Sequence, residues 1–172
     1  GRFGHVYLAN SLQQGFIYHA LNRDADDAYR VQQVFSYQSK LDIEKYTQAW
    51  QLVMQKFPIL RTAFNWDNAM LQVVYASAKL NYELHDISNL SVSEREAWII
   101  NKQQEDRKVG FDLTQPGLFR LHIIKQAEAR YTIIKSEHHS ISDGWSGPVL
   151  MGAVHDFYAQ LQKGMRPQVI PD

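Results

Sequence analysis

The sequence contains no cysteine, and this absence excludes disulfide bonds, thiolate nucleophiles and cysteine-ligated zinc. It also has no excess of charge, because 18 basic residues balance 18 acidic ones. Without net charge or a basic cluster, nucleic acid and anionic membranes are poor candidates for the main partner. No apolar run reaches the ~18 residues of a membrane-spanning helix, and no basic-then-apolar leader is visible. We therefore expect a soluble protein whose compartment is the cytoplasm.

The composition is that of a globular protein, with 45% hydrophobic and 12% aromatic residues in a chain of 172. This length suits one domain, or half of a larger one, and is long enough to bury a sizeable core. Predicted helices and strands mix without strict alternation along the chain. This order indicates an α+β layer sandwich, in which helices cover a largely antiparallel sheet.

Hydrophobic spacing predicts the individual elements. The expected helices cover 8–21, 42–57, 91–109 and 146–163. The expected strands cover 29–39, 59–66, 70–76, 82–86, 118–124 and 131–138. The helix over 42–57 has the clearest signals, because Asp42 can cap it and Pro58 ends it. The tail over 165–172 has no such pattern and resembles a linker.

The stretch "SEHHSISDGWS" (136–146) lies between a predicted strand and a predicted helix. Side chains alternate along a strand, so His138 and His139 face opposite sides and cannot readily share a metal ion. His139 and Asp143 could both be ligands, but no third ligand is near them, and we expect no metal site. Two alternatives stay open from the residues alone: a hydrogen-bonded structural turn, or an outward His139 that exchanges protons near pH 7.

Neighbouring residues suggest how such a site would be supported. A buried carboxylate needs a positive partner, and Arg61 in "ILRTAF" is the candidate partner of Asp143. Gly144 permits backbone torsions, or the close approach of a ligand, that a side chain would forbid. The remaining histidines fit packed or solvated structural roles: His5, His19, His85, His122 and His155.

Three motifs resemble those of one family. "HHSISDG" (138–144) fits the HHxxxDG signature of the condensation-domain superfamily of nonribosomal peptide synthetases, and "WS" (145–146) extends it as in many members. "FPILRTAF" (57–64) resembles the second motif of that family, in which LRTxF follows a helix. "LANSLQQGFIYHAL" (8–21) resembles the first motif, in the variant nearer to condensation domains that act downstream of epimerisation.

Two departures from the family pattern lie outside the signature positions. Glu137 precedes the paired histidines, where the family often has an apolar residue. Lys56 and Phe57 stand where the second motif often begins with Arg-His. We interpret both as variation within a subgroup.

The resemblance implies a fold like chloramphenicol acetyltransferase, built as two similar lobes in a V. Residues 1–164 would form the N-terminal lobe, and 165–172 would begin the linker to a missing C-terminal lobe. The family's active-site tunnel lies between the lobes. Peptidyl carrier proteins bring donor and acceptor on 4'-phosphopantetheine arms from opposite ends, so no cofactor bound by this chain itself is expected. A neighbouring adenylation domain is the other expected partner.

The resemblance also implies roles for the signature residues. His139 is the expected catalytic residue for attack of the acceptor amine on the donor thioester, either as general base or by positioning the amine. A general base contributes typically ~10²–10⁴-fold, and holding two tethered substrates together can be worth ~7–11 kcal/mol. Loss of His139 therefore need not abolish all turnover, and the isolated lobe is expected to be inactive.

The other site residues are expected to support His139. Asp143 and Arg61 would form a structural ion pair, and the Gly144 amide would lie near the oxyanion. His138 would be structural. The residues after the signature, Trp145 and Ser146, are expected in the substrate channel.

Three alternatives to a peptide-bond-forming lobe stay open. An epimerisation lobe shares the signature but inverts the α-carbon of one carrier-bound residue, and the first motif disfavours it. A non-catalytic lobe would dock a carrier or a neighbouring domain, although it has no evident need of an exposed second histidine. A free-standing trimeric acyltransferase shares the fold but needs another subunit to complete its site. A heterocyclising relative is disfavoured, because aspartates replace the paired histidines there.

Overall fold

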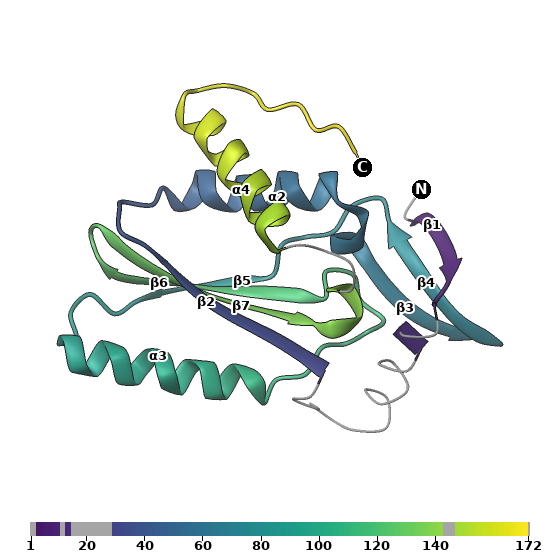
Figure 1. Ribbon diagram of the computed structural model, residues 1–172, viewed down its shortest axis with the longest axis horizontal. Helices are drawn as coiled ribbons and strands as arrows, with labels where there is room; N and C mark the ends of the chain where they lie inside the picture. Colours follow the sequence, from purple (N-terminus) through teal and green to yellow (C-terminus); the bar gives the residue numbers. More distant parts are fainter. Residues whose placement is uncertain (1–2, 11–12, 15–28, 143–146, 172) are drawn as a thin grey trace.

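The computed structural model describes residues 3–10, 13–14, 29–142 and 147–171 (Figure 1). The described helices, with the short 3₁₀ helices marked η, are α2 (Ile43–Lys56), η2 (Pro58–Arg61), α3 (Val92–Arg107), η3 (His139–Ile141) and α4 (Gly147–Gln162). The described strands are β1 (Phe3–Leu8), β2 (Arg30–Tyr37), β3 (Thr62–Asp67), β4 (Ala69–Tyr75), β5 (Tyr82–Asp86), β6 (Phe119–Ala127) and β7 (Arg130–His138). None of the helices in these ranges is long and apolar enough to cross a membrane.

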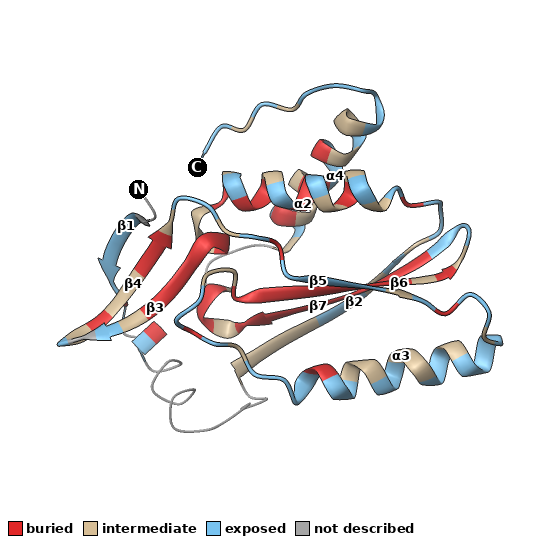
Figure 2. Ribbon diagram, turned by 180° about the vertical axis from the view of Figure 1, so that it is seen from behind, coloured by how far each residue is buried: buried red, intermediate tan, exposed pale blue. Residues whose placement is uncertain are grey.

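The larger sheet has the strand order β2-β7-β6-β5. Its pairs are antiparallel except β5 with β6, which run parallel, so the predicted mostly antiparallel sheet is confirmed. The connection predicted over 125–130 is too long, because β6 continues to Ala127 and β7 starts at Arg130. Helices α2 and α4 lie on one side of this sheet and α3 on the other (Figure 1). The two central strands are therefore buried on both faces, as Figure 2 shows.

Helix α2 forms where the local signals predicted it. The Asp42 side chain accepts a hydrogen bond from the Lys45 amide, and the helix ends at Lys56, just before Pro58. Its apolar stripe is buried against the sheet and α4. Trp50 is fully buried and its ring centroid lies 5.5 Å from that of Phe119 in β6.

The smaller sheet has the order β1-β4-β3, and all its pairs are antiparallel. The prediction of a strand over 59–66 is wrong at its beginning, because Pro58–Arg61 form the 3₁₀ helix η2. Proline fixes φ and lacks an amide hydrogen, which suits the first turn of a helix better than a strand. Arg61 thus precedes the strand instead of lying within it. Asn68 makes the tight β3–β4 turn with a positive φ of 62°.

The N-terminal segment contains a strand that the sequence did not predict, ahead of the helix expected within 8–21. Phe3–Leu8 form β1, with Val6, Tyr7 and Leu8 all exposed, so no alternating pattern marked this strand. Asn10 has the hydrogen bond of an N-cap, because its side chain accepts from the Gln13 amide at 2.8 Å. The remainder of that predicted helix, over 15–21, lies outside the described residues.

Helix α3 is attached to the sheet in an unusual way. Ser91 and Glu94 form a capping box at its start. Trp98 and Ile99 pack on a small apolar cluster that contains Ile124 of β6. The buried residue of this helix, however, is the acidic Asp106 in its last turn. Burying a carboxylate without charged or hydrogen-bonding partners costs free energy, so the stability of this arrangement depends on the residues around Asp106.

Candidate functional site

The signature begins at the carboxyl end of β7, a central strand whose position is fixed by β2 and β6 on either side. His138 is the last residue of β7, and His139 starts the 3₁₀ helix η3. The His139 carbonyl accepts hydrogen bonds from the Ser142 amide and hydroxyl, at 3.1 Å and 2.9 Å. The chain therefore leaves the sheet in a tight hydrogen-bonded turn immediately after the first histidine.

His138 lies in the interior, with 6% of its surface exposed. Its Nδ1 accepts a hydrogen bond from the Ser140 amide at 3.1 Å and lies 2.7 Å from the Ser140 hydroxyl. Burial, together with the neighbouring His139 and Arg30, lowers its pKa from 6.5 to about 4. The ring is therefore neutral near pH 7, and its hydrogen bonds stabilise the turn.

His139 has a different environment. It is partly exposed, whereas the residues on both sides of it, His138 and Ser140, are buried. The two histidines thus differ in burial, but strand alternation is not the reason, because β7 ends at His138 and His139 begins η3. The exposure of the His139 ring is uneven, because its Nδ1 is buried.

The first motif contacts the signature turn through Gln13. This side chain is 95% buried, and its Nε2 donates to the Ser140 carbonyl at 3.4 Å. The Asn10 amide donates to the Gln13 Oε1 at 3.1 Å, so both ends of the Gln13 amide group are used. No such role for Gln13 was predicted from the sequence. The available signal for a buried role was a polar residue within the segment predicted to be helical.

A buried polar network lies behind the signature, centred on Asp106. Its carboxylate accepts from Arg120 Nε at 2.5 Å, from His122 Nε2 at 3.3 Å, from Gln32 Nε2 at 3.0 Å, and from the Ser136 hydroxyl. Burial alone would raise the pKa of Asp106, but the hydrogen bonds from His122, Arg120 and Ser136 outweigh it and hold that pKa well below its usual range. The network therefore contains a permanent buried anion.

Phe111 connects this network to His138. The Arg120 guanidinium lies 4.4 Å from the centre of the Phe111 ring, and the Arg30 guanidinium lies 5.3 Å from it. The Phe111 and His138 rings meet edge to face, with their centroids 6.4 Å apart. The inward histidine thus packs against an aromatic ring that two cations hold in place.

Arg61 is buried, and its guanidinium donates to three main-chain carbonyls. The acceptors are Met54 at 2.9 Å, Gln55 at 3.4 Å, and Tyr75. Burial lowers its pKa. These bonds join the end of α2 to the end of β4. Asp143 lies outside the described residues, so the expected Arg61–Asp143 ion pair stays a prediction.

Glu137, the departure from the family pattern, has a buried partner. Lys135 Nζ lies 2.8 Å from Glu137 Oε1, and both side chains are at least 90% buried. The two residues are two apart in β7, so both side chains lie on the same face of the sheet as the buried Ile133. The acidic residue before the signature is thus neutralised within its own strand.

A hollow of about 640 Å³ lies between the edge strand β2 and the first turns of α4. Its walls include Gln33 and Tyr37 from the strand and Gly147, Met151 and His155 from the helix. Gly147 begins the helix that follows the signature in sequence. Its volume is sufficient for a small molecular group.

The remaining expected site residues, Asp143, Gly144, Trp145 and Ser146, lie outside the described residues. Within the ranges that are described, no set of three potential metal ligands gathers at the signature. The structure therefore brings Gln13, Ser140 and the two histidines together, with the Asp106 network behind them.

Comparison with known proteins identifies the family. The family described as "Condensation domain" matches residues 4–172. The N-(5-amino-5-carboxypentanoyl)-L-cysteinyl-D-valine synthase of Penicillium rubens is 38% identical over 163 residues, covering 92% of this chain and 4% of the synthase. The synthase of the same name from Amycolatopsis lactamdurans is 41% identical over 160 residues, covering 91% and 4%. One of the linear gramicidin synthase proteins of Brevibacillus parabrevis is 35% identical over 161 residues, covering 92% and 2%.

Solved structures share the fold. The starter condensation domain of rhizomide synthetase RzmA superposes with a TM-score of 0.85 at 18% identity, covering 97% of this chain and 42% of that one. The first condensation domain of the calcium-dependent antibiotic synthetase superposes with a TM-score of 0.82 at 19% identity, covering 97% and 40%. The predicted α+β, chloramphenicol acetyltransferase-like fold is confirmed. Although it spans only 4% or less of these three synthases, this chain belongs to the condensation-domain family of nonribosomal peptide synthetases.

Proposed function

We propose that this chain is the N-terminal lobe of a condensation domain that forms amide bonds. The donor would be an acyl or peptidyl thioester on one carrier protein, and the acceptor an aminoacyl thioester on another. The observation that carries the proposal is the turn at the end of β7, which buries His138 and leaves His139 partly exposed in a chain of this family. The relatives named above are synthases of peptides, which agrees with this chemistry.

The two histidines would have different roles. The lowered pKa of His138 and its bonds to Ser140 suit a neutral structural ring. His139 would contact the attacking amine, either accepting its proton or holding it against the thioester carbonyl. General-base catalysis is worth ~10²–10⁴-fold, and positioning can contribute ~7–11 kcal/mol. Both roles predict a large but incomplete loss of activity when His139 is removed.

The supporting residues have narrower proposed roles. Asp143 would lie close to Arg61 and stabilise the turn, and the Gly144 amide would face the developing oxyanion. Trp145 and Ser146 would line the channel. The hollow beside Gly147 and His155 would be part of that channel.

The domain layout follows from the same proposal. Residues 1–164 would form the lobe and 165–172 the start of the linker to a C-terminal lobe, consistent with coverage of 42% of a solved condensation domain. The carriers would supply 4'-phosphopantetheine arms, and this chain would bind no cofactor of its own. A neighbouring adenylation domain and a cytoplasmic location complete the proposal. A lobe without its counterpart would be inactive, because half of the tunnel wall is absent.

The test uses the intact condensation domain that contains this chain, mixed with donor-loaded and acceptor-loaded carrier proteins. The wild type should form the dipeptidyl thioester, and His139→Ala should lower the rate by about 10²–10⁴-fold. The matched control is His5→Ala, because His5 is an exposed histidine on β1 in the smaller sheet. Wild-type turnover in His139→Ala would remove His139 from the mechanism. Exchange of the substrate α-proton with solvent in the absence of acceptor would instead identify an epimerisation domain.

A further inference from the structure

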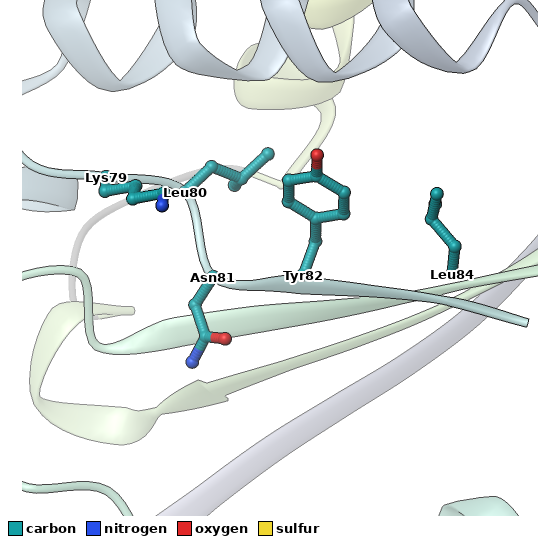
Figure 3. Close-up of a pocket in the computed structure, with 5 residues that line it drawn as sticks. All are labelled: Lys79, Leu80, Asn81, Tyr82 and Leu84. Atoms are coloured by element: carbon teal, nitrogen blue, oxygen red, sulfur yellow. The ribbon is translucent and has the colours of Figure 1, made fainter.

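Two histidines and a glutamate converge on the face of the larger sheet that α3 covers. Glu83 and His85 are two apart in β5, so their side chains lie on the same face. Figure 3 shows the other set of β5 side chains, with Tyr82 and Leu84 pointing together towards α2 and Asn81 pointing the opposite way. His122 of β6 is the register partner of Glu83 in the parallel pair, which places it on the Glu83 side.

The polar atoms of these three residues lie close together. His85 Nε2 is 3.0 Å from His122 Nδ1, and Glu83 Oε2 is 3.6 Å and 3.7 Å from those two nitrogens. The circle through three points with these separations has a radius of about 2.0 Å, which matches zinc–nitrogen and zinc–carboxylate bond lengths. An ion at its centre would thus lie at bonding distance from all three ligand atoms.

The surroundings prepare His122 to be a ligand. Its Nε2 lies 3.3 Å from Asp106 Oδ1 and donates to that carboxylate, so its proton is on Nε2 and Nδ1 presents a lone pair. Metal-binding histidines in proteins commonly donate their other ring N–H to a carboxylate in this way, which fixes the ring and raises its basicity. Hydrogen bonds from Arg120 and Gln32 hold the Asp106 carboxylate in place for this contact.

His85 and Glu83 complete the donor set. The His85 ring directs its Nε2 towards His122 Nδ1 at 3.0 Å, so both ring nitrogens face the same point. Glu83 is largely exposed, which leaves room for water molecules in the remaining coordination positions. Lys102 is the nearby opposing charge, and its ammonium lies 3.6 Å from Glu105. Nε2 of His85 binds a metal ion in the tautomer that carries the ring proton on Nδ1.

We propose that Glu83, His85 and His122 bind one divalent transition-metal ion such as Zn²⁺. Asp106 holds His122 in the orientation that binds the ion. Two imidazoles and one carboxylate suit Zn²⁺, Co²⁺ or Ni²⁺ better than Mg²⁺ or Ca²⁺, which prefer all-oxygen sites. The ion joins the edge strand β5 to its neighbour β6 and is independent of the amide-forming chemistry. The sequence assigned His85 and His122 only structural roles, because nothing in it revealed the parallel register.

The test is a Co²⁺ titration of the intact condensation domain, followed by visible absorption and by calorimetry with Zn²⁺. The wild type should bind one equivalent at this site and give the absorption bands of Co²⁺ with nitrogen and oxygen ligands, with a rise in melting temperature that EDTA reverses. Glu83→Gln is the first variant, because an exposed side chain can be changed without disturbing the fold. It should weaken binding at least about tenfold, and His85→Ala should weaken it further.

Matched controls separate this site from other histidines. His5→Ala removes an exposed histidine elsewhere, and His139→Ala removes the partly exposed histidine of the signature. Both controls should bind Co²⁺ as the wild type does. The proposal is overturned if Glu83→Gln and His85→Ala, both folded, retain wild-type affinity, or if the wild type gives neither Co²⁺ bands nor a calorimetric signal.

Discussion

Protonation of His138 should destabilise the folded protein in a narrow pH range. The ring is 94% buried, and its Nδ1 already accepts from the Ser140 amide. A protonated ring would place an N–H against that donor and would put a charge where Arg30 and His139 already oppose it. The unfolded chain has no such cost and takes up its proton near pH 6.5.

The sign and size follow from these two pKa values. Between pH 6.5 and about 4 the unfolded state binds the proton and the folded state does not, so the free energy of unfolding falls as pH falls. One pKa unit corresponds to 1.36 kcal/mol, so His138 should account for a loss of about 3 kcal/mol over this interval. The contribution is fully present above pH 6.5.

The assay is urea unfolding, followed by tryptophan fluorescence at several pH values from about 7 to 4. His138→Asn keeps an acceptor for the Ser140 amide but cannot be protonated, so its stability curve should be flatter by about 3 kcal/mol over that range. His85 also has a lowered pKa, and His85→Gln shows how much of the slope comes from that residue. Parallel curves for the wild type and His138→Asn would refute the reasoning.

Two further substitutions test buried charges. Asp106→Asn should lower the free energy of unfolding by about 3–5 kcal/mol, because it leaves the buried Arg120 without its anion, whereas Glu105→Gln, at the exposed neighbour, should change it little. Equal urea midpoints for these two variants would contradict the role of the network. Lys135→Met should also cost about 3–5 kcal/mol by leaving Glu137 buried alone, and adding Glu137→Leu should recover most of that loss. If the double variant is no more stable than Lys135→Met, then Lys135 does more than neutralise Glu137.

Local signals predicted much of this structure. Asp42, the apolar spacing after it and Pro58 are consecutive features, and they were enough to place α2 almost to the residue. The apolar segment "YTIIKSEH" likewise predicted the strand that the structure shows as β7. These features depend on neighbours in sequence, and such neighbours are visible without a fold.

Pairing between distant segments was not predictable in the same way. The parallel register of β5 and β6 brings Glu83 beside His122, and no residue in either strand encodes that alignment by itself. Gln13 contacts Ser140 from 127 positions away. The exposed strand β1 lacked an alternating pattern because neither of its faces is buried. Each of these features depends on which distant segments pack together, and that packing is determined by the whole chain.

The Asp106 network also has a consequence for how α3 sits on the sheet. Apolar contacts such as those of Trp98 tolerate sliding, but hydrogen bonds to one carboxylate are directional. Moving the helix sequence by one residue would rotate Asp106 by about 100° about the helix axis and leave Arg120 unpaired. We infer that this one carboxylate sets the register of α3 on the sheet. It fixes both the rotation and the axial position of the helix, whereas the apolar contacts alone would permit several positions.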